Sequence, residues 1–149
     1  MGILVDNYNV SLKIIGSGSM FEEYKKIIKN HNIEKYVEIL PPVNDTKDLL
    51  LASDIYFLLS EGEGFPLGLL EAMSCGIPSI ISNLAPFDEI DDQCILRVNP
   101  KSPGQIKDAI ECLMNLDNYN KISLNSRNYV IKNHTWEVVA NKYLEVINS

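Results

Sequence analysis

The sequence has few cysteines, no long apolar run and no basic signal, and each scarcity excludes a class of protein. Cys75, Cys94 and Cys112 are widely spaced and form no Cys-x-x-Cys pair, which argues against a zinc or redox motif and fits a reducing, cytoplasmic setting. The longest apolar run, Ile55 to Leu59, is far shorter than the ~20 residues of a membrane-spanning helix. Met1 to Leu4 lacks the basic start of a secretion signal. Neither a membrane-spanning nor a secreted protein is expected.

Basic residues are also too few and too scattered for a nucleic-acid-binding protein. The chain has 13 Lys and Arg against 20 Asp and Glu, a formal net charge of −7. No basic cluster is longer than Lys25-Lys26, so no nucleic-acid partner is expected. The 149 residues, 46% of them hydrophobic, suffice for one domain whose core needs neither disulfides nor a structural metal.

Strand and helix patterns alternate along the chain. The predicted strands are 10–15, 36–40, 54–60, 78–82 and 94–98, and the predicted helices begin near residues 20, 45, 66, 103, 119 and 136. The apolar run in 54–60 is typical of a strand buried on both faces of a parallel sheet. This pattern predicts the α/β class, with an open, mostly parallel Rossmann-like sheet and helices on both faces.

Several residues predict where helices begin and end. Pro66 suits the first position of a helix that carries Leu67, Leu70 and Met73 inward and ends at Gly76. Ser102 is predicted to cap a later helix, with Pro103 at its first position. In open parallel sheets, ligands bind outside the carboxyl ends of the strands. The loops to inspect are therefore 16–19, 40–43, 60–66 and 82–86.

The first of these loops begins like a dinucleotide-binding fingerprint. Gly16 and Gly18 fit, but Phe21 stands where a third small residue is required, and Leu40-Pro41 occupies the place of the ribose-binding acid. NAD binding is therefore not expected. A tight strand-to-helix turn explains the glycines. The remaining functional interpretation is a helix N-terminus whose N–H groups can approach a sugar or phosphate.

The segment from Glu61 to Met73 is the stronger candidate. Gly64 and Gly68 allow close approach of the backbone, and a proline-initiated helix directs N–H groups at an oxyanion. Glu63 and Glu71 flank the start of this helix, and ionised carboxylates are acceptors suited to ribose or sugar hydroxyls. A plain strand-loop-helix connection, with acids favoured by the helix dipole, is the structural alternative. Against it, Glu71 interrupts an apolar stretch and would need a partner there.

Residues 63–81 resemble the Glu-x7-Glu signature of the GT4 family of retaining glycosyltransferases, including the trailing Glu-Ala-Met-x-x-Gly-x-Pro. The resemblance extends over nearly the whole chain, through Ile14 to Gly18, Ala52 to Ile55, Asp88 to Ile90 and Thr135 to Glu137. It implies the C-terminal, nucleotide-sugar half of a GT-B fold, covering residues 1–149 without its first strand and helix.

The resemblance also implies roles for individual residues. Glu63 would be the catalytic-site acid against the donor-sugar hydroxyls, and Glu71 would bind the nucleotide ribose. The backbone around Gly64, Phe65, Leu67 and Gly68 would meet the diphosphate. The remaining donor-binding residues would be Gly16, Gly18, Leu40 and Pro41, the last two near the base, where the family often has a glycine in place of this proline pair.

The implied reaction is transfer of a hexose from a nucleoside diphosphate sugar to a glycan or lipid-linked acceptor, with retention, without a cofactor and without a metal. Residues 61–96 hold seven acids and no Lys or Arg, although the departing diphosphate needs positive charge. The resemblance also implies that the acceptor-binding domain of the family is missing from this chain. We therefore expect the isolated chain to be inactive, with a missing domain or partner chain as its complement and any peripheral membrane association through that domain.

Other readings stay open. A non-catalytic α/β interaction or regulatory module that kept the fold is the alternative function. The acidic run 88–92 is interpreted as a solvated loop rather than a metal site, and Cys75 as a packing residue near a helix C-terminus. The apolar stripe that begins at Trp136 is typical of a core-facing helix, whose exposed part would favour self-association.

Overall fold

The computed structural model describes residues 8–83 and 89–148. By its internal contacts the chain divides into two compact units, residues 1–46 and 47–149, and each is described by itself. That residues 1–149 form one domain without its first strand and helix stays a prediction. Residues 84–86 of the predicted ligand loop and Asp88 of the acidic run lie outside the described residues.

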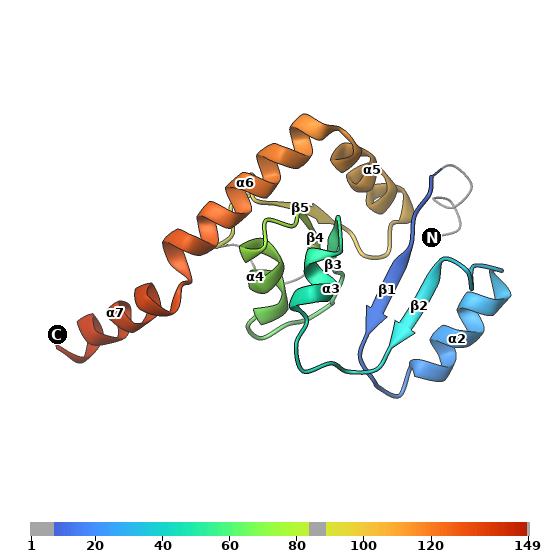
Figure 1. The fold of residues 1–149 in the computed structure, drawn as a ribbon, viewed down its shortest axis with the longest axis horizontal. Coiled ribbons are helices and arrows are strands. Elements are labelled where there is room, and N and C mark those ends of the chain that lie inside the picture. The colour runs from blue at the N-terminus through green and yellow to red at the C-terminus, as the bar shows by residue number, and fades with distance from the viewer. Residues whose placement is uncertain (1–7, 84–88, 149) are drawn as a thin grey trace. The chain divides into compact units, whose positions relative to one another are not determined.

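The first unit is a strand-helix-strand motif (Figure 1). Strands β1 (Leu12–Ile15) and β2 (Val37–Leu40) are parallel, with Leu12 opposite Val37 and Ile15 opposite Leu40. Helix α2 (Phe21–Asn30) connects them, as the apolar spacing after the glycine loop predicts. Side chains in β1 alternate between half-buried and exposed, because successive residues of a strand face opposite sides.

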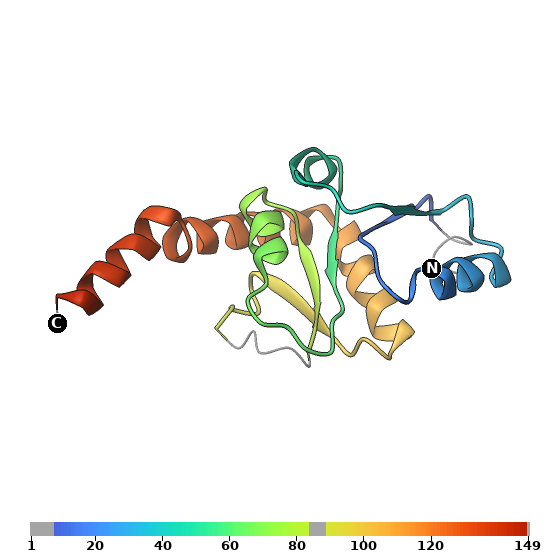
Figure 2. The ribbon, with the colours of Figure 1, turned by 90° about the horizontal axis from the view of Figure 1, so that it is seen from below.

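The second unit holds a three-stranded parallel sheet with helices around it (Figures 1 and 2). Its strands are β3 (Tyr56–Leu58), β4 (Ser79–Ser82) and β5 (Ile95–Val98), in the order β3-β4-β5. Its helices are α3 (Lys47–Leu51), α4 (Leu67–Ser74), α5 (Pro103–Met114), α6 (Leu116–Asn133) and α7 (Trp136–Ile147). The predicted α/β class, with parallel strands in open sheets, is confirmed.

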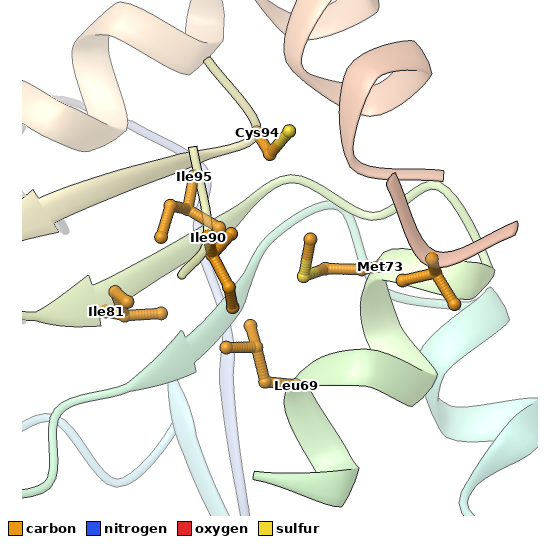
Figure 3. Packing of buried hydrophobic residues seen from close by; sticks show 7 residues of the cluster. Leu69, Met73, Ile81, Ile90, Cys94 and Ile95 are labelled. Carbon is orange, nitrogen blue, oxygen red and sulfur yellow. The ribbon is translucent and has the colours of Figure 1, made fainter. Parts of the chain in front are cut away.

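The core of the second unit gathers apolar side chains from α4, β4, β5 and α6. Leu69 and Met73 of α4 are fully buried and point toward Ile81 and Ile95 of the sheet (Figure 3). Val130 of α6 completes the cluster with Ile90 and Cys94. Burying a large apolar side chain stabilises the fold by about 1.5–3 kcal/mol, so these contacts hold α4 firmly against the sheet.

Two sequence predictions about this region are wrong. The most buried strand is β4, whose four residues are all buried, whereas every residue of β3 is only half-buried. The reason is position, since β4 lies between two strands and β3 has one partner in its unit. Helix α4 begins at Leu67, and Pro66 occupies the N-cap rather than the first helical position.

Of the three α4 residues predicted to point inward, Met73 is fully buried and Leu70 packs against the core, but Leu67 does neither. Leu69 is 0% exposed, whereas Leu67, predicted to point inward, is 61% exposed. Leu67 to Met73 is mostly apolar, so two helical phases fit the sequence, and the sheet selects the one that buries Leu69, Ala72 and Met73.

The helix caps of the C-terminal part follow the prediction more closely. Ser102 accepts a hydrogen bond from the amide of Gln105, and Pro103 begins α5. Helix α7 lies away from the sheet in both views (Figures 1 and 2) and buries none of its residues. Trp136 is 88% exposed, so the prediction that this stripe faces a core is wrong. Among the described residues, no helix is long and apolar enough to cross a membrane.

Candidate functional site

Six of the predicted site residues lie in the loop between β3 and α4 or in the first two turns of α4, in the second unit. They are Glu63, Gly64, Phe65, Leu67, Gly68 and Glu71. Helix α4 has no side-chain hydrogen bond at its N-terminal cap. The Leu67 amide donates to the carbonyl of Phe65, and the Leu69 and Leu70 amides donate to that of Pro66. Part of the predicted anion-binding amide set is therefore engaged within the chain.

The two predicted carboxylates differ in their surroundings. Glu63 is half-buried and accepts a hydrogen bond from the hydroxyl of Ser60 in the same loop. Glu71 lies on the exposed side of α4, opposite the buried residues Leu69 and Met73. The interpretation that Glu71 is a charge in apolar surroundings is therefore wrong, because consecutive helical residues point about 100° apart.

Sequence reasoning missed Tyr56, whose hydroxyl lies against the first turn of α4 at Gly68. Burial raises the pKa of Tyr56 above its ordinary value, and the negative charges of Glu63 and Glu71 raise it further. That Glu63 and Glu71 line one donor site stays a prediction. Tyr56 lay within an apolar run that indicates a strand, and nothing in that pattern separates a site residue from a packing residue.

The position of the Tyr56 hydroxyl explains why residue 68 is a glycine. A Cβ atom on Gly68 would lie 2.8 Å from the hydroxyl oxygen of Tyr56, closer than real Cβ contacts come. Gly68 therefore admits the tyrosine against the first turn of α4. A Cβ on Gly64, in contrast, would meet nothing within 4 Å. That Gly64 and Gly68 allow a ligand to approach the backbone stays a prediction.

Phe65 stands at the rim of this loop, beside a histidine from the junction of α6 and α7. The side chain of Phe65 is 65% exposed, and its ring centre lies 6.3 Å from that of His134. The His134 Nε2 atom is 3.3 Å from the hydroxyl of Tyr129, which donates to the carbonyl of Glu89 at 3.2 Å. Burial lowers the pKa of His134, and Lys142 lowers it further against a smaller opposite effect of Glu89.

A lysine that the sequence analysis did not assign reaches the same end of the sheet. Lys101, in the loop after β5, forms a 2.7 Å ion pair with Glu61, in the loop after β3. The hydrogen bond between them lowers the pKa of Glu61 and raises that of Lys101. Both side chains are largely exposed, so the pair contributes little to stability. It does add a positive charge beside an otherwise acidic loop.

The other four predicted donor-binding residues lie in the first unit. The Gly16 amide donates a 3.0 Å hydrogen bond to the carbonyl of Leu40, so the glycine loop and Leu40-Pro41 adjoin. Gly16 has a φ of +143°, which favours glycine, and a Cβ on Gly18 would meet nothing within 4 Å. Their part in donor binding stays a prediction.

Other candidate chemistries find little support in the structure. Residues 8–83 and 89–148 contain no group of three or more His, Cys, Asp or Glu placed to hold a metal. In the acidic run, Asp91 accepts from the Gln93 amide and Asp92 pairs with Arg97 at 2.6 Å. The three cysteines are free thiols, and Cys75 caps the end of α4.

Comparison with known proteins gives one consistent family. The family model described as "Glycosyl transferases group 1" matches residues 2–147. An N-acetyl-alpha-D-glucosaminyl L-malate synthase of Bacillus anthracis is 29% identical over 143 residues, 94% of this chain and 38% of that protein. The chain spans about two fifths of the length of several relatives that it matches along nearly its whole length.

Solved structures agree on the fold. The C-terminal domain of a glycosyl transferase group 1 family protein from Francisella tularensis has a TM-score of 0.77 at 24% identity, covering 91% of this chain and 75% of that one. The Anabaena protein HepE, in complex with UDP-glucose, has a TM-score of 0.84 at 18% identity, covering 93% of this chain and 41% of that one.

Proposed function

Because the chain belongs to the glycosyl transferases group 1 family, we propose that it is the donor-binding domain of a retaining glycosyltransferase. It takes a nucleoside diphosphate sugar and contributes to transfer of a hexose to a glycan or lipid-linked acceptor. The observation that carries this proposal is that Glu63 lies in the loop before α4 and Glu71 in the second turn of α4, beyond the carboxyl end of β3. HepE, with the same fold, was crystallised with UDP-glucose, which supports this class of donor.

Different residues of the chain are suited to different parts of the donor. Glu63 and Glu71 are acceptors for sugar and ribose hydroxyls, and the first turn of α4 lies at the positive end of a helix dipole, where a diphosphate is favoured. Catalysis requires the leaving diphosphate to be stabilised where its charge develops. Residues 61–96 contain no Lys or Arg, and Lys101 is paired with Glu61. We therefore expect the isolated chain to bind donor without turnover.

A titration with UDP, GDP and ADP tests this proposal. A ligand present at 100 times its dissociation constant stabilises the folded state by about 2.7 kcal/mol, which a thermal melt resolves. We expect one of the three nucleotides to raise the melting temperature saturably. Unchanged melting with all three at millimolar concentration would contradict the proposal.

The second candidate function is a non-catalytic interaction or regulatory module. One observation favours it, since α7 buries none of its residues and exposes Trp136, Tyr143 and Ile147. Exposed apolar faces of this kind mark interaction surfaces. The same titration separates the two functions, because an interaction module that lost donor binding responds to no nucleotide.

A further inference from the structure

A hollow of about 290 Å³ separates one face of α6 from the turn that precedes β5. Residues three or four positions apart lie side by side on a helix, and five lining residues share a face of α6 in this way: Asn125, Asn128, Tyr129, Lys132 and Asn133. The turn supplies the other lining residues: Asp91, Gln93 and Cys94. None of these residues belongs to the candidate donor site.

The turn before β5 is held in place from several sides. Ile90 and Cys94, at its two ends, are both buried in the core cluster. Between them, the carboxylate of Asp91 accepts a 2.8 Å hydrogen bond from the amide of Gln93. The guanidinium of Arg97 donates to the carbonyl of Ile90 at 2.9 Å. This wall of the hollow is therefore formed before any ligand binds, which lowers the entropic cost of binding.

Two hydrogen bonds join this wall to α6. The side-chain amide of Asn125 donates to the carbonyl of Gln93 at 3.1 Å, and the hydroxyl of Tyr129 donates to the carbonyl of Glu89 at 3.2 Å. Asp91, which lines the hollow, lies between Glu89 and Gln93 along the chain. The two bonds fix the spacing between the turn and the helix, so the hollow is a built feature of the fold.

Polar groups remain available at the surface of the hollow. In the described part of the chain, residues 8–83 and 89–148, the side chains of Asn128 and Lys132 form no hydrogen bond or ion pair. Asn128 is an exposed residue inside α6, where alanine would favour the helix more, so helix stability does not account for it. A carboxamide both donates and accepts hydrogen bonds, an ammonium only donates, and the carboxylate of Asp91 only accepts.

This set of groups matches the chemistry of a sugar. Sugar hydroxyls both donate and accept, and the ring carries C–H groups that can lie against an aromatic side chain, which Tyr129 supplies. The charges of Lys132 and Asp91 are opposite and cancel, so the hollow favours a neutral ligand. Its volume lies at the lower end of the ~300–1,000 Å³ of small-molecule sites, which suits a single unit.

We propose that this hollow binds one unit of a neutral saccharide, at a site separate from the candidate donor site. Asn128 and Lys132 donate to the hydroxyls of the sugar, Asp91 accepts from them, and Tyr129 packs against the ring. The inference goes beyond the proposed function and does not rest on it, because no residue of the loop after β3 takes part.

NMR of the side-chain amides in the labelled chain tests the site. The probes are the methyl glycosides of glucose, galactose, mannose and N-acetylglucosamine, each of which stands for a unit inside a glycan. We expect at least one of them, at tens of millimolar, to shift the side-chain amide signals of Asn125, Asn128 and Asn133 saturably. No shift with any of the four, or shifts of the same size at Asn120 on the same helix, would overturn the proposal.

Two variants then test the assigned contacts. Asn128→Ala and Lys132→Gln are each expected to weaken binding of that glycoside by about threefold to tenfold, the worth of one hydrogen bond. The matched controls are Asn120→Ala and Lys121→Gln, which change exposed residues of α6 outside the hollow and should leave the affinity unchanged. Wild-type affinity in both Asn128→Ala and Lys132→Gln would overturn the proposal.

Titration in the presence of UDP-glucose separates this site from the donor site. We expect the glycoside to shift Asn125, Asn128 and Asn133 equally with and without UDP-glucose. Glycoside shifts confined to residues 63–71 would overturn this inference and leave the proposed function standing. A chain that binds the glycoside in the hollow but none of UDP, GDP and ADP would lose the proposed function and keep this site.

Discussion

The hydroxyl of Ser123 on α6 donates a 2.6 Å hydrogen bond to the carbonyl oxygen of Gly76, just beyond the end of α4. The two residues are far apart in sequence, and their contact fixes the carboxyl end of the helix whose amino end carries the candidate site. Gly76 itself has a φ of +74°, and a Cβ there would lie 3.1 Å from the Ser123 hydroxyl oxygen. The end of α4 is therefore specified by a glycine and by a partner helix.

Gly76→Ala should destabilise the chain. The left-handed conformation costs a residue with a side chain about 1–2 kcal/mol, and the crowded Ser123 hydroxyl adds to that cost. Urea unfolding measures the change in the free energy of unfolding. Gly104→Ala is the control, because Gly104 is helical and unobstructed, and it should lose nothing. Equal stability of the two variants would count against this description of the helix end.

The phase of α4 predicts a contrast between two leucines. Leu69→Ala removes a fully buried side chain and should lower the free energy of unfolding by about 2–5 kcal/mol. Leu67→Ala truncates a side chain that is 61% exposed, and its effect should stay within about 0.5 kcal/mol. Denaturant melts of both variants measure the difference. A larger loss for Leu67→Ala would mean that the helix has the opposite phase.

These leucines also mark what the sequence can predict. Capping residues such as Ser102 and Pro103 act locally, so the start of α5 was predictable from a few side chains. The buried face of α4 was only partly predictable, because Leu67, Leu69 and Leu70 place apolar side chains on more than one face; the sequence predicted Met73 and Leu70 correctly and Leu67 wrongly. Contacts with the sheet decide which of them is buried.

The candidate site likewise contains residues that the sequence indicates and residues that only the fold reveals. Glu63 and Glu71 could be proposed from the sequence because a family resemblance fixes their spacing. Tyr56 could not, because it looks like any other residue of an apolar strand, and only the fold brings its hydroxyl to Gly68. Lys101 was missed for a similar reason, since its pairing with Glu61 joins loops that follow different strands.

His134 should make stability depend on pH. Its pKa in the folded state lies below the unfolded value of about 6.5, so the unfolded chain binds more protons as the pH falls. The stability that this group contributes is present above the unfolded pKa and is lost as the pH falls through the folded pKa. Urea unfolding of the wild type and of His134→Gln at a series of pH values measures the loss.

His134→Gln is expected to lose less stability on acidification than the wild type. The control His31→Gln, at the end of α2, retains His134 and is expected to retain the wild-type loss. If the free energy of unfolding fell equally with pH in the wild type and in His134→Gln, His134 would not be the source of the pH dependence.

Substitution of Glu63 and of Glu71 should affect the binding of different ligands. Glu63→Gln should weaken binding of a nucleotide sugar and spare the bare nucleotide, because Glu63 is assigned to the sugar. Glu71→Gln should weaken both, because Glu71 is assigned to the ribose. Hydrogen bonds to charged groups are worth about 1.5–3 kcal/mol, so losses of about tenfold or more are expected by calorimetry.

Glu61→Gln is the matched control for these variants, since Glu61 lies in the same loop and its partner is Lys101. It should leave the affinity for both ligands nearly unchanged. If Glu63→Gln weakened the bare nucleotide as much as the nucleotide sugar, the assignment of Glu63 to the sugar would be wrong.

The most direct test of the account is to observe where a donor binds on the isolated chain. Amide NMR of the labelled chain, titrated with UDP-, GDP- and ADP-sugars, reports each backbone position separately. The account predicts saturable shifts for residues 63–71 with one of these donors. Shifts confined to other surfaces, such as the polar face of α6 around Asn125 and Asn128, or no shifts at millimolar donor, would contradict it.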